Sequence, residues 1–161
     1  MKKKSLIVLS MICLTTLAAD AAFAAPTAIS IATGGTSGTY YPIGCAIAAA
    51  VNKNPELNGT AETGNAAVAN TNLVAGGEIE IAFSQADVNT PSVMALLITS
   101  DNISEDVVYN FTKTLFKNIS DVQGSHAMAR NIRLETATVG LTAPLHRGAA
   151  KYYREVGINI D

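Results

Sequence analysis

The hydrophobic positions near the start of the chain predict a strand followed by a helix. Residues 28–32 form a short apolar run of the kind that builds a strand. Apolar residues then recur at the three- and four-residue spacing of an amphipathic helix, at Ile43, Ile47, Ala50 and Val51. Pro42 suits the first turn of this helix, where a missing N–H costs nothing. Residues 52–55 are expected to end it.

The next segments predict a second strand, a second helix and a third strand. Residues 59–63 are expected to form the short second strand. Asn65 then precedes a helical run over residues 66–75, with Asn65 as its N-cap and two glycines after it as its stop. Three apolar residues alternate with residues 78, 80 and 82, namely Ile79, Ile81 and Phe83. That alternation predicts a half-buried strand.

The pattern changes after Asn89. Residues 93–98 form an apolar run that predicts another strand. Ser104 is expected to cap a helix whose first turn holds Glu105 and Asp106, because acidic side chains suit the positive end of a helix dipole. The predicted buried face of that helix comprises Val107, Val108, Phe111, Leu115 and Ile119, with Lys113 and Lys117 away from it. Residues 121–130 and 145–155 predict two further helices, the last with Tyr152 and Tyr153 packed near its end.

This order of elements predicts an α/β fold with a short, mostly parallel sheet and flanking helices. Strands that alternate with helices over so few residues require parallel pairing with helical crossovers. In such a sheet, ligands bind beyond the carboxyl ends of the strands. Three loops are expected to emerge there, residues 34–39, 64–65 and 84–87, and all carry small or polar residues. Their convergence predicts one binding site.

The first of these loops carries the strongest chemical signal. Gly34, Gly35 and Gly38 stand among hydroxyl residues between the predicted strand and the predicted helix. Such a turn leaves backbone N–H groups and the positive end of a helix dipole facing one spot, which suits a carboxylate or another small anion. The loop lacks the Lys-Ser/Thr pair of a phosphate-binding P-loop. A tight turn with no ligand is the alternative that the pattern alone leaves open.

The first 24 residues are typical of a cleaved export signal. Three lysines at positions 2–4 precede an apolar stretch at residues 6–17, and Ala22-Phe23-Ala24 has the small residues of a cleavage site. No later run approaches the ~20 apolar residues of a transmembrane helix. We therefore predict a product that is soluble and periplasmic or otherwise extracytoplasmic.

Charge and composition exclude several classes of function. Of the 11 basic and 13 acidic residues, the predicted signal holds three lysines and Asp20, so the remaining 137 residues hold 8 and 12, a formal charge of −4. No basic stripe marks a nucleic-acid partner. Cys45, the one cysteine left, allows no internal disulfide and lies on the helical apolar pattern, which predicts a small core residue. His126 and His146 lack metal-ligand spacing, so surface or cap roles are expected. No nucleophile–base pair is recognisable, and we predict no catalytic residue, no metal and no cofactor.

Several blocks of the chain, in the same order, resemble the TAXI solute-binding subunits of TRAP transporters, also called extracytoplasmic immunogenic proteins. The blocks are residues 31–42, 62–70 and 77–87, with 104–109 and 143–155 in the C-terminal part. The resemblance covers residues 29–88 and 92–158, almost all of the predicted mature chain. It implies a non-enzymatic protein that binds a small organic anion or an amino acid and delivers it to TRAP membrane permease subunits.

The chain departs from that family in length. Its members are much longer and resemble type II periplasmic binding proteins, whose two α/β lobes close on a solute. One lobe is expected here, with residues 25–88 as its βαβαβ part and residues 89–161 adding a strand and helices. The middle of the family pattern, which supplies most of the second lobe, is missing between about residues 87 and 91. Smaller departures are Asn65 where glycine is usual, Ser104 where proline is usual, and Arg147 where proline usually follows the histidine.

The resemblance implies a ligand site on the three loops. Hydroxyl and backbone donors to a carboxylate would come from Gly35, Thr36, Ser37, Gly38 and Thr39. Selectivity would be completed by Tyr40, Asn65, Gln85 and Asp87. Asp87 would repel a plain dicarboxylate, so an amino acid, with its ammonium group, explains that residue better. The alternative is a non-binding remnant, or a single-lobe surface protein that acts through protein contacts, because one lobe leaves a solute half solvated.

Overall fold

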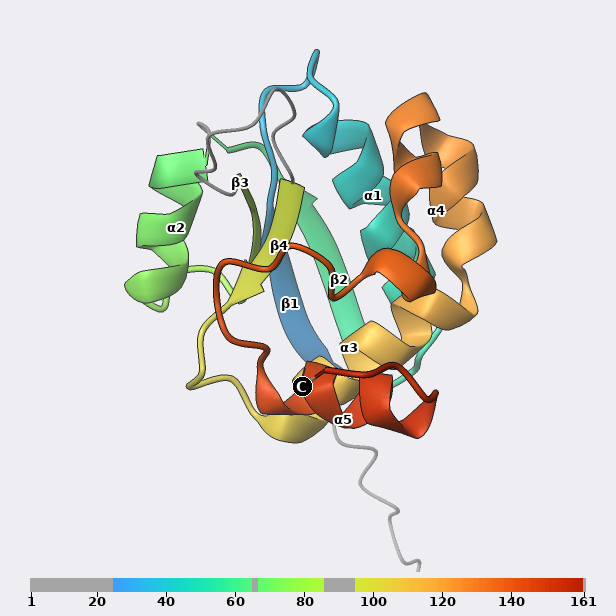
Figure 1. Cartoon of the computed structure of the whole chain (residues 1–161). Coiled ribbons are helices and arrows are strands. Elements are labelled where there is room, and N and C mark those ends of the chain that lie inside the picture. The colour runs from blue at the N-terminus through green and yellow to red at the C-terminus, as the bar shows by residue number, and fades with distance from the viewer. Residues whose placement is uncertain (1–24, 65–66, 86–94, 161) are drawn as a thin grey trace, which may run out of the picture.

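The described residues fold around a four-stranded mixed sheet. The structure, a computed structural model, describes residues 25–64, 67–85 and 95–160 (Figure 1). Its strands are β1 (Thr27–Ala32), β2 (Leu57–Glu62), β3 (Ile81–Gln85) and β4 (Ala95–Thr99), in the order β2-β1-β3-β4. β1 pairs in parallel with β2 and with β3, and β4 pairs antiparallel with β3. The predicted α/β class and the mostly parallel sheet are confirmed.

Helices cover both faces of the sheet (Figure 1). The helices are α1 (Tyr40–Val51), α2 (Ala67–Ala75), α3 (Glu105–Lys117), α4 (Ile119–Ser125) and α5 (Arg147–Glu155), with two short 3₁₀ helices, η1 (Ala127–Asn131) and η2 (Leu134–Thr136). α2 lies on one face, and α1 with α3 and α4 lies on the other. α5 packs against α3.

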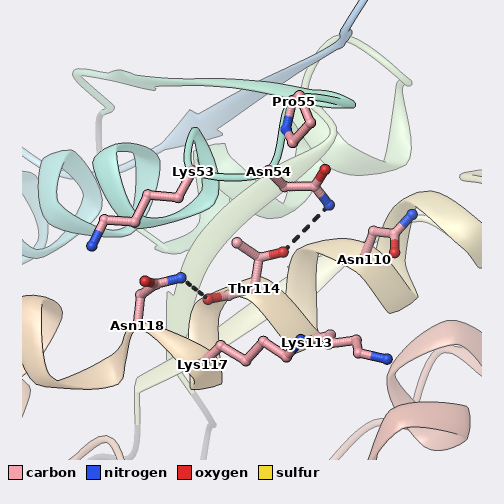
Figure 2. A pocket seen from close by; sticks show the side chains of 8 residues that line it. All are labelled: Lys53, Asn54, Pro55, Asn110, Lys113, Thr114, Lys117 and Asn118. Carbon is pink, nitrogen blue, oxygen red and sulfur yellow. Dashed lines mark hydrogen bonds between the residues drawn. The ribbon is translucent and has the colours of Figure 1, made fainter.

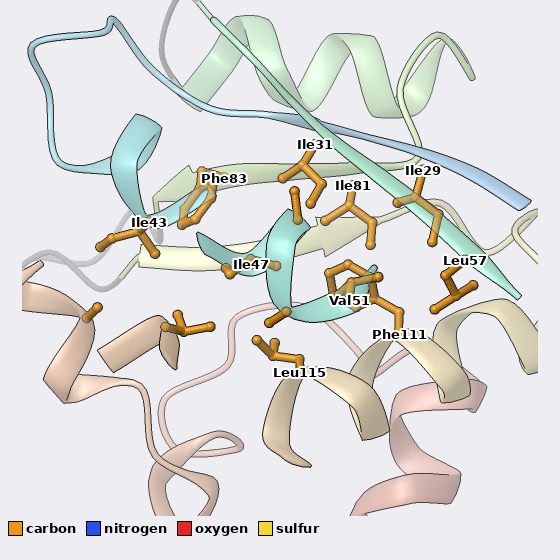
Figure 3. Close-up of a cluster of buried hydrophobic side chains, with 14 residues drawn as sticks. Ile29, Ile31, Ile43, Ile47, Val51, Leu57, Ile81, Phe83, Phe111 and Leu115 are labelled. Carbon is orange, nitrogen blue, oxygen red and sulfur yellow. The ribbon is translucent and has the colours of Figure 1, made fainter. Parts of the chain in front are cut away.

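The main core lies between the sheet and α1, with α3 closing it from below in Figure 3. Ile29 and Ile31 of β1 and Phe83 of β3 point into it, together with Ile47 and Val51 of α1. A smaller cluster lies under α2 on the opposite face, and it comprises Ala32, Val74, Ile79 and Ala82. Both faces of the central strands are therefore buried.

Three predicted cap residues are found at helix ends, while Asn65, the predicted N-cap of α2, lies outside the described residues. The Ser104 hydroxyl accepts a hydrogen bond from the Val107 N–H at 3.2 Å, with two acidic residues in the first turn of α3. His146 Nδ1 accepts from the Gly148 N–H at the start of α5, and His126 Nδ1 accepts from the Met128 N–H at the start of η1. Each bond satisfies a backbone donor that a helix start leaves unpaired.

Three local predictions are wrong. The third strand is not half-buried, because Ala82 and Ser84 on its second face are covered by α2. The helix predicted over residues 121–130 is interrupted, since α4 ends at Ser125 and His126 has extended backbone angles before η1 begins. Cys45 is exposed and is not a core residue.

The position of Cys45 follows from helix geometry. The buried residues of α1 are Ile43, Gly44, Ile47, Ala48, Ala50 and Val51. At about 100° per residue, Cys45 points roughly 140° away from the centre of that face. Small residues on both sides of the helix obscured this in the sequence, because alanines do not distinguish a core face from a solvent face.

Candidate functional site

The candidate site begins where β1 and β2 end together. Thr33 follows β1 and is fully buried. Its N–H and its hydroxyl both donate to the Glu62 carbonyl oxygen, at 2.9 and 2.7 Å. The first two loops therefore leave the sheet from a fixed point, as expected at the carboxyl edge of parallel strands.

A buried asparagine on α2 links this point to β3. Asn70 is fully buried, and its Nδ2 group donates to the Thr33 and Phe83 carbonyl oxygens, each at 2.8 Å. Its Oδ1 atom has no hydrogen-bond partner among the described residues. Sequence reasoning did not single out Asn70, although an amide inside the apolar stretch of a helix was the available signal, because buried polar groups are hydrogen-bonded.

Two glycines allow close contacts around Thr33. A Cβ at Gly44 would lie 2.3 Å from Thr33 Cγ2, so α1 approaches the end of β1 only because it has no side chain there. A Cβ at Gly64 would lie 2.4 Å from the Thr33 carbonyl oxygen and 2.5 Å from Asn70 Oδ1. Both positions exclude a Cβ unless the neighbouring groups move.

The glycine-rich loop extends from this buried platform into solvent. Its residues 35–38 are exposed. The Gly38 N–H donates to the Gly35 carbonyl oxygen at 2.8 Å, and the Gly64 N–H donates to the Gly34 carbonyl oxygen at 3.4 Å. Thr39 is the N-cap residue of α1, but within the described residues its side chain makes no capping bond. The first-turn amides of α1 are thus not satisfied by a side-chain cap, and they remain donors for water or for a ligand.

Tyr40 and Gln85 are in direct contact at this edge. Gln85 Nε2 donates to the Tyr40 hydroxyl oxygen at 3.0 Å, across 45 residues of sequence. The Tyr40 ring stacks on Phe83, with ring centroids 4.9 Å apart and planes 16° apart. The start of α1 and the end of β3 are therefore joined through side chains that the sequence had assigned to the site.

The remaining predicted site residues fall into two groups. Gly35, Thr36, Ser37, Gly38 and Thr39 precede Tyr40 in the chain, and among the described residues none of them is hydrogen-bonded to Gln85. Asn65 and Asp87 lie outside the described residues. Their assignment to a ligand site stays a prediction.

Two hollows formed by described residues contain none of the predicted site residues. One, of about 440 Å³, lies between the end of α1 and α3 (Figure 2) and is lined by Lys53, Asn54, Pro55, Asn110, Lys113, Thr114, Lys117 and Asn118. The other, of about 460 Å³, is lined by Thr138, Leu141, Ala143, Pro144, Leu145, Ala150, Arg154, Asn159 and Ile160. The first lies near the amino end of β2, away from the loops described above.

Two of the three lysines at the first hollow already have anionic partners. Lys53 pairs with Asp121, and Lys113 pairs with Glu155 at 3.1 Å. Hydrogen bonds to Tyr109 and to Glu155 raise the pKa of Lys113, and the hydrogen bonds that Glu155 accepts from the Tyr109 hydroxyl and from Lys113 lower the pKa of Glu155. The contacts of Glu155 connect α5 to α3, whereas the Lys53–Asp121 pair connects the end of α1 to α4.

Two further features bear on the kind of site. In the part of the chain that the structure describes, no three His, Cys, Asp or Glu side chains are grouped as metal ligands. No helix formed by those residues is both long enough and apolar enough to cross a membrane.

Comparison with known families supplies the class of protein. The family model described as "NMT1-like family" matches this chain over two segments, residues 31–90 and 84–157. That family has a periplasmic-binding-protein fold, and this short chain, with four strands and five helices in its described residues, fits a single lobe. Its members are solute-binding proteins, usually extracytoplasmic, so a small-molecule ligand is implied. The chain belongs to the NMT1-like family.

Proposed function

We propose that this protein is an exported solute-binding subunit of a TRAP-type transporter, of the TAXI kind. It binds a small carboxylate or an amino acid, catalyses no reaction, and delivers the solute to membrane permease subunits. The basic and apolar N-terminal segment, cleaved after Ala24, directs it to the periplasm or another extracytoplasmic space.

One observation supports the position of the ligand site. The loops after β1 and β2 and the end of β3 meet at one edge of the sheet, where Asn70 bonds to Thr33 and Phe83 and Gln85 bonds to Tyr40. The first loop carries exposed hydroxyl groups, and the uncapped first-turn amides of α1 follow directly after it. In a family of solute-binding proteins, donors of this kind suit a carboxylate.

The missing second lobe sets the expected affinity. A two-lobed receptor buries its ligand on both sides, whereas this chain presents the loop to solvent. Hydrogen bonds that compete with water contribute about 1 kcal/mol each. About four such bonds would contribute about 4 kcal/mol, which corresponds to a dissociation constant of roughly 1 mM.

Calorimetry of the chain from residue 25 onward tests this proposal against a panel of organic acids and amino acids. Heat release that is abolished by Gln85→Ala supports it. Gln123→Ala is the matched control, since Gln123 donates to the Ile132 carbonyl oxygen in a different part of the fold. That control should bind as the parent chain does.

A second candidate function is favoured by the exposure of the glycine-rich loop. Its residues 35–38 are open to solvent, and an edge that lacks its opposing lobe leaves a solute half solvated. On this reading the chain is a non-binding remnant, or a surface protein that acts through protein contacts. A cooperatively folded sample that releases no heat with any compound of the panel favours this second candidate.

A further inference from the structure

Asn70 occupies the place where the pairing of β1 with β3 stops. The parallel register joins Ile31 to Ile81 and Ala32 to Ala82, and it extends no further. The next register pair is Thr33 and Phe83, and both of their carbonyl oxygens accept from the Asn70 amide at 2.8 Å. A side-chain amide thus bridges the two strands where the backbone ladder ends.

The same side chain also supports the loop after β2. Asn70 Oδ1 would lie 2.5 Å from a Cβ at Gly64, so this loop is in van der Waals contact with the amide. The Gly64 N–H in turn donates to the Gly34 carbonyl oxygen in the first loop. One fully buried residue therefore contacts the chain segments from which all three candidate loops emerge.

The site residues follow these anchor points closely in sequence. The glycine-rich loop begins one residue after Thr33, and Gln85 lies two residues after Phe83. Tyr40 stacks on Phe83 and bonds to Gln85, so the distance between β1 and β3 at this level sets where the Tyr40 and Gln85 side chains meet.

We propose that Asn70 is a positioning residue for the ligand site: it sets the spacing of the chain segments that carry Gly34, Gly64 and Gln85, without touching the ligand. The role in ligand binding rests on the proposed function, whereas the effect of Asn70 on the loops does not depend on any ligand. Without the amide, two buried carbonyl oxygens lose their donor, and the strand ends separate until water can reach them.

The test compares Asn70→Asp with Thr71→Val in the chain from residue 25 onward. Asp has nearly the shape of Asn, but as a carboxylate it offers no donor to the two carbonyl oxygens. Thr71 is the neighbouring residue on α2, and its hydroxyl bonds to Ala67 and Ser84 but to no strand-end carbonyl. The control thus removes a polar group from the same helix without removing the bridge.

Amide hydrogen exchange measured by NMR is the first readout, and it needs no ligand. In Asn70→Asp at neutral pH, the Thr33 and Gly64 amides, which donate to the Glu62 and Gly34 carbonyl oxygens, should exchange about tenfold faster or more, while the amides of α3 keep their rates. At acid pH the protonated carboxyl regains one donor, so part of the protection should return, which loss of packing alone would not produce. Thr71→Val should leave the Thr33 and Gly64 rates within about twofold of the parent.

Binding of L-glutamate and of glutarate, which differ only in the amino group, is the second readout. Affinity for whichever of the two binds the parent should fall about tenfold in Asn70→Asp and stay unchanged in Thr71→Val. If the parent binds neither probe while the loop amides respond as described, the proposed function fails for these solutes and the positioning of the loops stands.

Two results overturn the inference. One is an Asn70→Asp variant whose loop amides exchange at parental rates. The other is exchange that rises equally in the loops and in α3, which would make Asn70 a residue of general stability. If the variant does not fold, the parent decides the question. Its Asn70 side-chain amide protons must then exchange with the same opening free energy as the Thr33 and Gly64 amides, and a different value excludes the bridge.

Discussion

The close approach of α1 to the end of β1 makes the substitution Gly44→Ala informative. Alanine is favoured over glycine inside a helix by about 1 kcal/mol, so helix propensity alone predicts a stabilised protein. The added Cβ would lie 2.3 Å from Thr33 Cγ2, a separation that side chains do not adopt. Thr33 cannot rotate freely, because its hydroxyl donates to the Glu62 carbonyl oxygen at 2.7 Å.

The clash between the added Cβ and Thr33 should outweigh the gain in helix propensity from alanine. Overpacking of a core typically costs about 1–3 kcal/mol, so Gly44→Ala is expected to lower the free energy of unfolding by about 1 kcal/mol net. Thr33→Ser removes the offending methyl group and keeps the hydroxyl. The next contacts of the added Cβ are then Phe83 Cε2 at 3.5 Å and the Cβ of residue 33 at 3.6 Å, both ordinary distances.

The sign of the effect should therefore reverse in the Thr33→Ser background. There Gly44→Ala should raise the free energy of unfolding by up to about 1 kcal/mol, which gives a coupling between the two sites of about 2 kcal/mol. Urea denaturation of the four proteins of this double-mutant cycle measures it. An equal loss in both backgrounds, or a gain in the parent, would show that the Thr33–Gly44 contact does not limit the packing of α1.

Two further predictions concern α5. Burial raises the pKa of Tyr153 to about 12, so its neutral form is favoured in the folded state. The unfolded chain loses this proton near pH 10, so stability should fall as pH rises from about 10 to 12, by up to about 3 kcal/mol. Denaturation of Tyr153→Phe across that range should show a shallower decline, and an identical decline would contradict the burial argument. Gly148→Ala would place a Cβ 2.3 Å from the Glu105 carbonyl oxygen and 2.7 Å from the Tyr109 nitrogen, so the helices must separate at a cost of about 3 kcal/mol. The matched control is Gly124→Ala on α4, where the added Cβ meets nothing within 4 Å and stability should rise slightly, and two equal responses would refute the close packing of α5 on α3.

The fold could be predicted from periodicity because most elements obey a simple local rule. β1, α1 and α3 each carry the spacing and end signals that define them, and the Ser104 cap with its acidic first turn marked the start of α3 to the residue. The parallel pairing of β1 with β2 and β3 followed from the alternation of strands and helices.

The incorrect predictions concern segments whose burial or helix ends are determined by tertiary contacts. The second face of β3 is buried because α2 packs over Ala82, and no pattern within the strand records which neighbours will cover it. The helix predicted after Asp121 is interrupted at His126, whose ring accepts a hydrogen bond from the Met128 N–H and so begins a separate turn.

Within the candidate site, the sequence indicated which side chains could contact a ligand, but not which buried residues hold them in place. Tyr40 and Gln85 could be nominated from their positions after a glycine loop and a strand, and the structure places them in contact. The roles of Thr33 and Asn70 could not be predicted from the sequence, because each side chain bonds to carbonyl groups of segments that are distant in sequence. The assignment of Asn65 and Asp87 to the ligand site remains a prediction from the sequence, because both residues lie outside the described part of the chain.

An NMR titration of the chain from residue 25 onward with L-glutamate and glutarate locates any bound solute residue by residue. If the loops at the carboxyl edge of the sheet form the ligand site, the amide signals of residues 36–40 and of Gln85 should shift together, with a dissociation constant of roughly 1 mM. Shifts confined to Lys113 and Lys117 at the far hollow, or no shift at all in a folded sample, would contradict that assignment.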